Sequence, residues 1–194
     1  DIESATNVAA SINGIAIATN VGIEEDIQSL VKVTEEQLGP VDIFVSNAGV
    51  SFSDAPDWMA ASAPNEHWMT SWNVNVMAHV FAARAVVPSM IKRGGGYLVN
   101  VASGASLLCQ IGDAAYSTTK TAAVGFAESL AITHGDDNIA VSVVCPLYVA
   151  TRMTEGGRGI SGSDAMMSAD DAAKAVLEGM AKQQFLIMPH DELD

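Results

Sequence analysis

Basic side chains are scarce in this sequence. Its 194 residues include 9 lysines and arginines against 23 aspartates and glutamates, which gives a formal net charge of −14 at pH 7. Neutralising a phosphate backbone requires a basic surface, so this composition argues against a nucleic-acid partner. The excess of carboxylates predicts a solvated acidic surface instead.

Cysteine is scarce as well. The sequence has only Cys109 and Cys145, both in apolar surroundings, and its four histidines are not spaced from them as metal ligands would be. This usage favours two reduced, buried thiols over a disulfide or a metal site. We therefore predict a cytoplasmic protein that holds no metal.

Long unbroken apolar runs are also missing. Stretches such as 94–112 are interrupted by glycine, asparagine, serine and glutamine, so no segment is predicted to span a membrane. The first residues lack the basic flank and apolar run of a signal peptide. Hydrophobic residues nevertheless make up 49% of the chain, enough for a packed core. With no repeat or linker visible, we expect a single domain over residues 1–194.

Short apolar runs alternate with longer helical patterns along the chain. The expected strands are 14–19, 41–47, 96–103, 139–146 and 185–189. The expected helices are 3–12, 24–38, 65–93, 114–134 and 169–183. Nearly continuous apolar strands joined by helices are typical of a parallel sheet covered on both faces. The pattern therefore predicts an α/β fold with a doubly wound parallel sheet.

Two connecting segments, 50–64 and 147–168, are longer than usual, and each follows an expected strand. In open α/β sheets ligands bind beyond the carboxyl ends of the strands, and long loops in compact domains often carry function. The second segment is rich in glycine. We expect 147–168 to form a flexible flap over a substrate.

Tyr116 and Lys120 stand four positions apart in an otherwise small and apolar helical stretch. This spacing places both side chains on one face of a helix. A neighbouring ammonium stabilises a phenolate, so we expect Lys120 to lower the pKa of Tyr116 toward the working range of an acid or base. A tyrosine and lysine at this spacing also occur by chance on many surfaces. Ser103, at the end of an expected strand, could bond the same reacting oxygen.

Five motifs follow one another along the chain: SNAG (46–49), WNVNV with Asn75, NVAS ending at Ser103, YSTTK (116–120) and PLYVAT (146–151). In order and spacing the sequence resembles the short-chain dehydrogenase/reductase family, in its compact single-domain branch. The resemblance implies a Rossmann-like sheet and an NAD(P)-dependent oxidoreductase that interconverts a secondary alcohol and a ketone.

The resemblance also implies roles for individual residues. Tyr116 would be the general acid and base, Lys120 would lower its pKa and hold the nicotinamide ribose, and Ser103 would polarise the substrate oxygen. Asn75 would hold a water that relays protons from Lys120. Asp1 would bind the adenosine ribose and favour NAD over NADP. The residues expected along the cofactor are Asp1, Asn20, Val21, Asn47, Ala48, Gly49, Tyr116, Lys120, Pro146, Val149 and Thr151.

Two of the departures from the family pattern bear on the sheet and on the space beside the cofactor. Family members open with a strand and a glycine-rich turn that binds pyrophosphate, and nothing here matches it. We therefore expect the first β-α-β portion of the fold to be absent, which leaves the run 14–19 without a neighbour and exposes the edge of the strand at 41–47. In addition, Leu147 stands where a glycine normally follows Pro146, and it should narrow the space beside the nicotinamide.

The loops expected to surround the site are rich in Trp, Leu and Met, which favours a hydrophobic small-molecule substrate. The family resemblance further implies a homodimer or homotetramer. Two other functions stay open at this stage. One is a catalytically silent binding or regulatory protein, and the other is an epimerase or dehydratase that shares the Tyr-x-x-x-Lys spacing.

Overall fold

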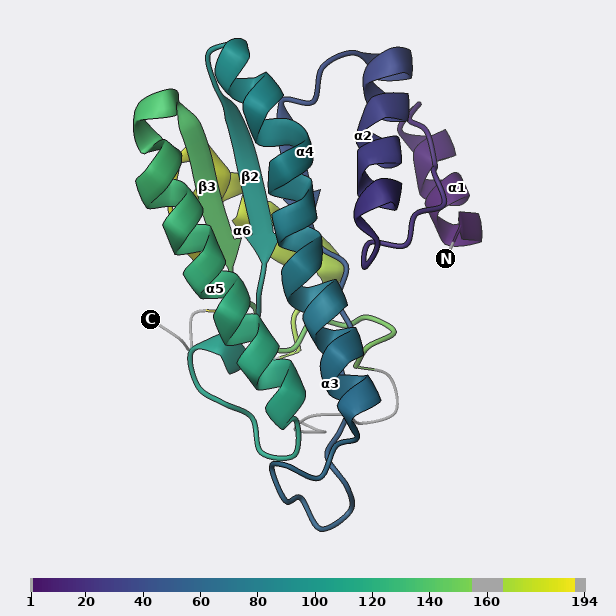
Figure 1. Cartoon of the computed structure of the whole chain (residues 1–194), viewed down its shortest axis with the longest axis vertical. Helices are drawn as coiled ribbons and strands as arrows, with labels where there is room; N and C mark the ends of the chain where they lie inside the picture. The colour runs from purple at the N-terminus through teal and green to yellow at the C-terminus, as the bar shows by residue number, and fades with distance from the viewer. Residues whose placement is uncertain (1, 155–165, 191–194) are drawn as a thin grey trace.

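A four-stranded parallel sheet organises the chain (Figure 1). The computed structural model describes residues 2–154 and 166–190. The strands lie in the order β1 (Ile43–Ser46), β2 (Gly96–Val101), β3 (Ile139–Val144) and β4 (Leu186–Ile187). All three neighbouring pairs are parallel. The predicted α/β fold with a parallel sheet is confirmed.

Helices cover both faces of this sheet. In Figure 1, α4 (Ala78–Lys92) and α5 (Ala114–His134) lie over one face, and α6 (Ala169–Ala181) lies behind the other. The helix α2 (Glu24–Leu38) packs on α4, and α1 (Ile2–Ser11) lies on the outer side of α2. The remaining elements are α3 (Asn65–Trp72), η1 (Asn73–Met77), η2 (Gly104–Ser106) and η3 (Gly135–Asp137).

The core is divided between the two faces by the alternation of side chains along the strands. On β2, Leu98 belongs to the cluster under α4 and α5, whereas Val99 belongs to the cluster under α6. Met90 of α4 and Val143 of β3 are fully buried in the first cluster. Burial on both faces explains why apolar residues predominate along β2 and β3.

The first expected strand does not form. Residues 14–20 take no strand conformation, so the prediction of a strand at 14–19 is wrong. A strand exists through hydrogen bonds to a neighbour, and no described strand lies beside this segment. β1 is an edge strand of the described sheet, as predicted for the strand at 41–47. Its Ile43 and Val45 are 52% and 51% exposed.

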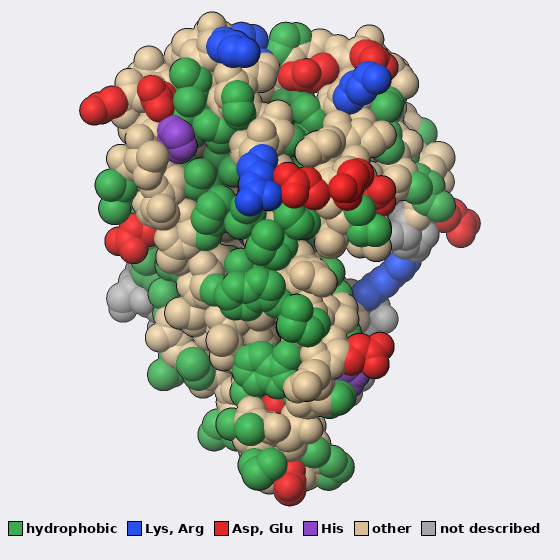
Figure 2. All heavy atoms as spheres, viewed as in Figure 1, with side chains coloured by type: hydrophobic (Ala, Val, Ile, Leu, Met, Phe, Trp, Pro, Cys, Tyr) green, Lys and Arg blue, Asp and Glu red, His purple; other side chains and the backbone are tan. Residues whose placement is uncertain are grey.

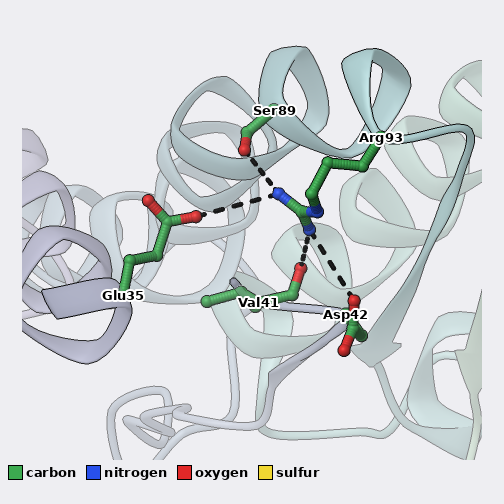
Figure 3. Close-up of polar contacts among 5 residues, drawn as sticks. All are labelled: Glu35, Val41, Asp42, Ser89 and Arg93. Carbon is green, nitrogen blue, oxygen red and sulfur yellow. Dashed lines mark hydrogen bonds and ion pairs between the residues drawn. The ribbon is translucent and has the colours of Figure 1, made fainter. Parts of the chain in front are cut away.

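The approach to β1 is fixed by Arg93 at the end of α4 (Figure 3). One guanidinium nitrogen donates to the Ser89 hydroxyl, and the other donates to the Val41 carbonyl at 2.6 Å. The carboxylates of Glu35 on α2 and Asp42 each lie 3.9 Å from the guanidinium. A single side chain therefore joins the ends of α2 and α4 to the start of the edge strand.

The helical run Asn65–Lys92 is long and apolar enough to cross a membrane by length and composition. Half of its most apolar window is buried inside the fold, as in the core helix of a globular domain. The cysteines are both free, and Cys145 is buried as predicted. The prediction that Cys109 is buried is wrong, because it lies in an exposed loop after η2.

Candidate active site

Ser103 lies just beyond the carboxyl end of β2 and caps the short helix η2. Its hydroxyl oxygen accepts a hydrogen bond from the Ala105 N–H at 3.2 Å, which leaves its own hydrogen free to donate. η2 packs against α5. This packing places the phenol of Tyr116, in the first turn of α5, near enough to Ser103 for the serine side chain to lower the pKa of Tyr116.

Lys120 follows one turn later and points inward. It is only 3% exposed, and its Nζ donates to the carbonyl of Val101, the last residue of β2, at 2.8 Å. The same nitrogen lies 5.7 Å from the centre of the Tyr116 ring. Burial lowers the pKa of Lys120 to about 8, although the neighbouring Cys145 acts in the opposite direction. Strand β2 thus holds a buried ammonium at its carboxyl end.

The prediction that Lys120 lowers the pKa of Tyr116 is wrong, because this pKa lies above its ordinary value. Burial raises the pKa of Tyr116, Asp113 raises it further, and only the hydrogen bond with Ser103 lowers it. The four-residue spacing correctly predicted that the two side chains lie close together. It could not predict how far the phenol is removed from water, and this burial has the larger effect on the pKa.

Asn75 lies in a wide turn of the long helix, the π-helical segment η1, and it is fully buried. Its side-chain amide bonds the Val50 backbone twice, accepting from the N–H and donating to the carbonyl, each at 2.9 Å. Its Nδ2 also donates to the Thr119 hydroxyl on α5 at 3.0 Å. Single π turns are often found at functional sites, and here the turn lets one amide join the loop after β1 to α5.

Lys120 and Asn75 both lie against Gly49. A Cβ placed on it would lie 3.3 Å from Lys120 Nζ and 3.4 Å from Asn75 Oδ1. The loop after β1 therefore runs directly against the lysine and the asparagine. A larger residue at this position would press on both side chains.

An open cleft of about 650 Å³ continues from Gly49. Its lining includes Asn20, Val21, Ala48 and Gly49, four of the residues predicted along a cofactor. The loop on its far side is shaped by Asn20, whose N–H donates to Asp26 and whose side-chain oxygen accepts from the Gly22 N–H. These predicted residues, distant in sequence, lie together around one cleft.

The other predicted residues are placed differently. Asn47 is exposed and is not among the residues lining this cleft. Pro146 lies beside the Ser103 turn, because its carbonyl accepts from the Gly104 N–H at 2.7 Å. Val149 forms an isolated bridge with Met167, and the Thr151 N–H bonds the Thr154 hydroxyl. Asp1 lies outside the described residues.

The predicted flap, 147–168, is described only at its two ends. Residues 155–165, which include all of its glycines, lie outside the described part of the chain. At the base of the segment, the Ala150 N–H donates to the Met167 carbonyl and the Met167 N–H donates to the Tyr148 carbonyl, both at 2.9 Å. The base is thus tied together, and the flexibility of the flap stays a prediction.

Two partners in the site were not identified from the sequence. One is Thr119, which accepts from Asn75, and the other is the Val101 carbonyl, which holds Lys120. The position of Thr119 inside the YSTTK motif was the only available signal. A backbone acceptor such as Val101 has no signature in a sequence.

Comparison with known proteins identifies relatives by sequence. The family profile described as short chain dehydrogenase matches residues 2–158. A 2-(R)-hydroxypropyl-CoM dehydrogenase from Xanthobacter autotrophicus is 33% identical over 73% of this chain and 56% of its own length. A 1-deoxy-11-beta-hydroxypentalenate dehydrogenase from Streptomyces exfoliatus is 32% identical over 91% of this chain. The match covers 65% of that relative, so the chain spans less than two thirds of the length of either protein.

Solved structures agree in fold. A short chain dehydrogenase/reductase from Burkholderia phymatum in complex with NAD superposes with a TM-score of 0.85 at 22% identity, covering 99% of this chain and 77% of the other. A 7 alpha-hydroxysteroid dehydrogenase complexed with NADH and 7-oxo glycochenodeoxycholic acid gives 0.86 at 22% identity, over 96% and 79%. The profile match extends over most of the sequence and includes the Ser103, Tyr116 and Lys120 cluster. The chain belongs to the short-chain dehydrogenase family.

Proposed function

We propose that this chain carries the catalytic site of an NAD(P)-dependent oxidoreductase that interconverts a secondary alcohol and a ketone. The observation that carries the proposal is the convergence of Ser103, Tyr116 and Lys120 at the carboxyl end of β2. A phenol beside a serine hydroxyl, with a buried ammonium behind it, is suited to exchanging a proton with a substrate oxygen. The two relatives named above are dehydrogenases, which supports the same reaction class.

In the direction of ketone reduction, Tyr116 donates its phenolic proton to the substrate oxygen as that oxygen gains charge. The raised pKa of Tyr116, caused mainly by burial, keeps this proton in place at neutral pH. Ser103 donates a hydrogen bond to the same oxygen and fixes its position. Lys120, held by the Val101 carbonyl, would hold the nicotinamide ribose, the other role that the family resemblance implies for it.

A bound nicotinamide would supply or accept the hydride in this chemistry. The cleft fits such a group, since Asn20, Val21, Ala48 and Gly49 line it and Lys120 lies directly behind Gly49. These residues would hold the cofactor. The preference for NAD over NADP rests on the assignment of Asp1, which only the family resemblance supports.

The substrate we propose is a hydrophobic small molecule. Large apolar side chains are exposed on the loops that follow the carboxyl ends of the strands, namely Trp58, Met59, Leu107, Leu108, Ile111, Met153 and Met166. Two of these loops are joined, because the Asp54 N–H donates to the Gly112 carbonyl at 2.7 Å and the Asp54 carboxylate accepts from the Ala114 N–H. Apolar rims of this kind favour organic ligands over highly charged ones.

We also propose a homo-oligomer in the cytoplasm. Hydrophobic side chains gather on the face formed by α3, α4 and α5 (Figure 2). Among the residues of these helices, Met69, Trp72 and Ile132 are exposed. Faces of this kind are commonly buried between subunits. Two free cysteines suit a reducing compartment.

The proposal is tested by following the near-ultraviolet absorbance of the reduced nicotinamide in the full-length protein. NAD and NADP are each offered with a panel of secondary alcohols of increasing apolar bulk. We expect turnover with one cofactor and higher kcat/KM for the bulkier apolar alcohols. Cofactor binding without any turnover would favour the silent binding protein, and isomerised or dehydrated product without net cofactor reduction would favour the epimerase or dehydratase.

A further inference from the structure

His190 is a buried histidine that the proposed reaction does not use. It follows strand β4 and is only 4% exposed. Its Nδ1 lies 3.2 Å from the backbone nitrogen of Leu147, and its Nε2 lies 3.1 Å from the carbonyl oxygen of Tyr148. A neutral imidazole protonated on Nε2 satisfies both contacts, accepting from the Leu147 N–H and donating to the Tyr148 carbonyl.

The sheet brings His190 to this place. β4 pairs with the end of β3, with Ile187 opposite Val144, and the Cys145 N–H donates to the Ile187 carbonyl at 2.9 Å. The chain after β4 therefore runs beside the turn that follows β3. His190 reaches the two peptide groups of that turn, Leu147 and Tyr148, which its own strand does not pair.

The same turn lies against the catalytic serine. The Gly104 N–H, directly after Ser103, donates to the Pro146 carbonyl at 2.7 Å. The side chain of Leu147 packs on Gly104 so closely that a Cβ placed there would lie 2.6 Å from Leu147 Cδ2. The position of the 146–148 turn thus determines where Leu147 stands beside Ser103.

We propose that His190 is a positioning residue for the reaction: it fixes the turn 146–148, so that Leu147 forms a rigid wall beside Ser103 and limits the shape of the substrate. This inference rests on the proposed function, because it assigns the space beside Ser103 to a substrate. The anchoring of the turn can be measured without any turnover. The anchoring of the turn and the placing of Leu147 both follow from one imidazole that bonds backbone groups of two consecutive residues.

The test compares three replacements of His190 in the full-length protein. His190→Phe keeps a ring of similar size and loses both hydrogen bonds. His190→Asn returns an acceptor near the position of Nδ1, and His190→Gln returns a donor near the position of Nε2. The control is His134→Phe, since His134 pairs with Asp137 at the far end of α5.

We expect His190→Phe to lower kcat/KM by about tenfold to a hundredfold, as a misplaced contact near reacting atoms does. It should also narrow the preference between small and bulky alcohols. His190→Asn should recover most of the loss, and His134→Phe should match the wild type. Amide hydrogen exchange at Leu147 should become faster in His190→Phe and should stay slow in His190→Asn.

The outcomes separate the two proposals. Wild-type kinetics in His190→Phe, or a loss that neither His190→Asn nor His190→Gln reduces, would overturn the positioning role. Unchanged exchange at Leu147 would overturn the anchoring itself. If the wild type turns over no alcohol or ketone while Leu147 exchange still responds, the proposed oxidoreductase function fails and the anchor at His190 stands.

Discussion

Replacing Lys120 by methionine should make the protein more stable near neutral pH while it removes activity. Lys120 is buried at the site, and burial lowers its pKa from the ordinary 10.5 to about 8. Methionine has a similar length and no charge to desolvate. A functional group that costs stability is common in active sites.

The magnitude follows from the pKa. A fall from 10.5 to about 8 corresponds to about 3 kcal/mol of unfavourable free energy for the buried ammonium. Below pH 8 both the folded and the unfolded chain carry the proton, so the whole cost is present. Between pH 8 and 10.5 the unfolded chain still binds the proton and the folded chain does not, so the stability of the wild type rises with pH relative to Lys120→Met. Against this, the variant leaves the Val101 carbonyl without its donor, which costs about 1–3 kcal/mol.

The assay is urea denaturation of wild type and Lys120→Met, without cofactor, from pH 7 to 10. We expect the variant to be equal or more stable at pH 7 by up to about 2 kcal/mol, and to lose about 2–3 kcal/mol relative to wild type by pH 10. Lys182→Met, at an exposed lysine, serves as the control for the loss of a lysine from the surface. A constant difference between wild type and Lys120→Met over this range would refute the reasoning.

Three further predictions concern the packing around the site and are measured by the same denaturation. Asn75→Ala removes three hydrogen bonds from a buried amide and should cost about 2–4 kcal/mol, since it strands the Val50 peptide groups; a cost below 1 kcal/mol would contradict this. Gly104→Ala should cost about 1–3 kcal/mol through overpacking, and adding Leu147→Ala should recover most of it; additive losses would argue against the contact. Arg93→Met should cost about 1–2 kcal/mol through its two short hydrogen bonds, with little dependence on salt, because its ion pairs are long and partly exposed.

Local signals predicted the helices well. The expected helices 24–38 and 114–134 have the bounds of α2 and α5. Gly39 and Gly135 directly follow the last residues of these helices, and helix ends of this kind can be read from a few neighbouring residues. The order of motifs likewise predicted that Ser103, Tyr116 and Lys120 meet, because each follows the end of a strand or lies on one helix face.

The features that were predicted wrongly or missed depend on contacts with residues distant in sequence. The run 14–19 has the composition of a strand, yet hydrogen bonds to a neighbour make a strand, and none of the described strands lies beside it. Whether the pKa of Tyr116 is raised or lowered depends mainly on how deeply the phenol is buried. His190 was not predicted as a functional residue, because its two hydrogen bonds go to backbone groups 42 and 43 positions away.

The proton role of Tyr116 is tested most directly by comparing wild type and Tyr116→Phe in two measurements on the full-length protein, the turnover of the best alcohol and the Kd of the cofactor. Phenylalanine keeps the ring beside Lys120 and removes only the hydroxyl. We predict a loss of about 10²–10⁴-fold in kcat with a cofactor Kd within about threefold of wild type. A Tyr116→Phe enzyme that keeps a kcat within about threefold of wild type would contradict the assignment of Tyr116 as the acid and base.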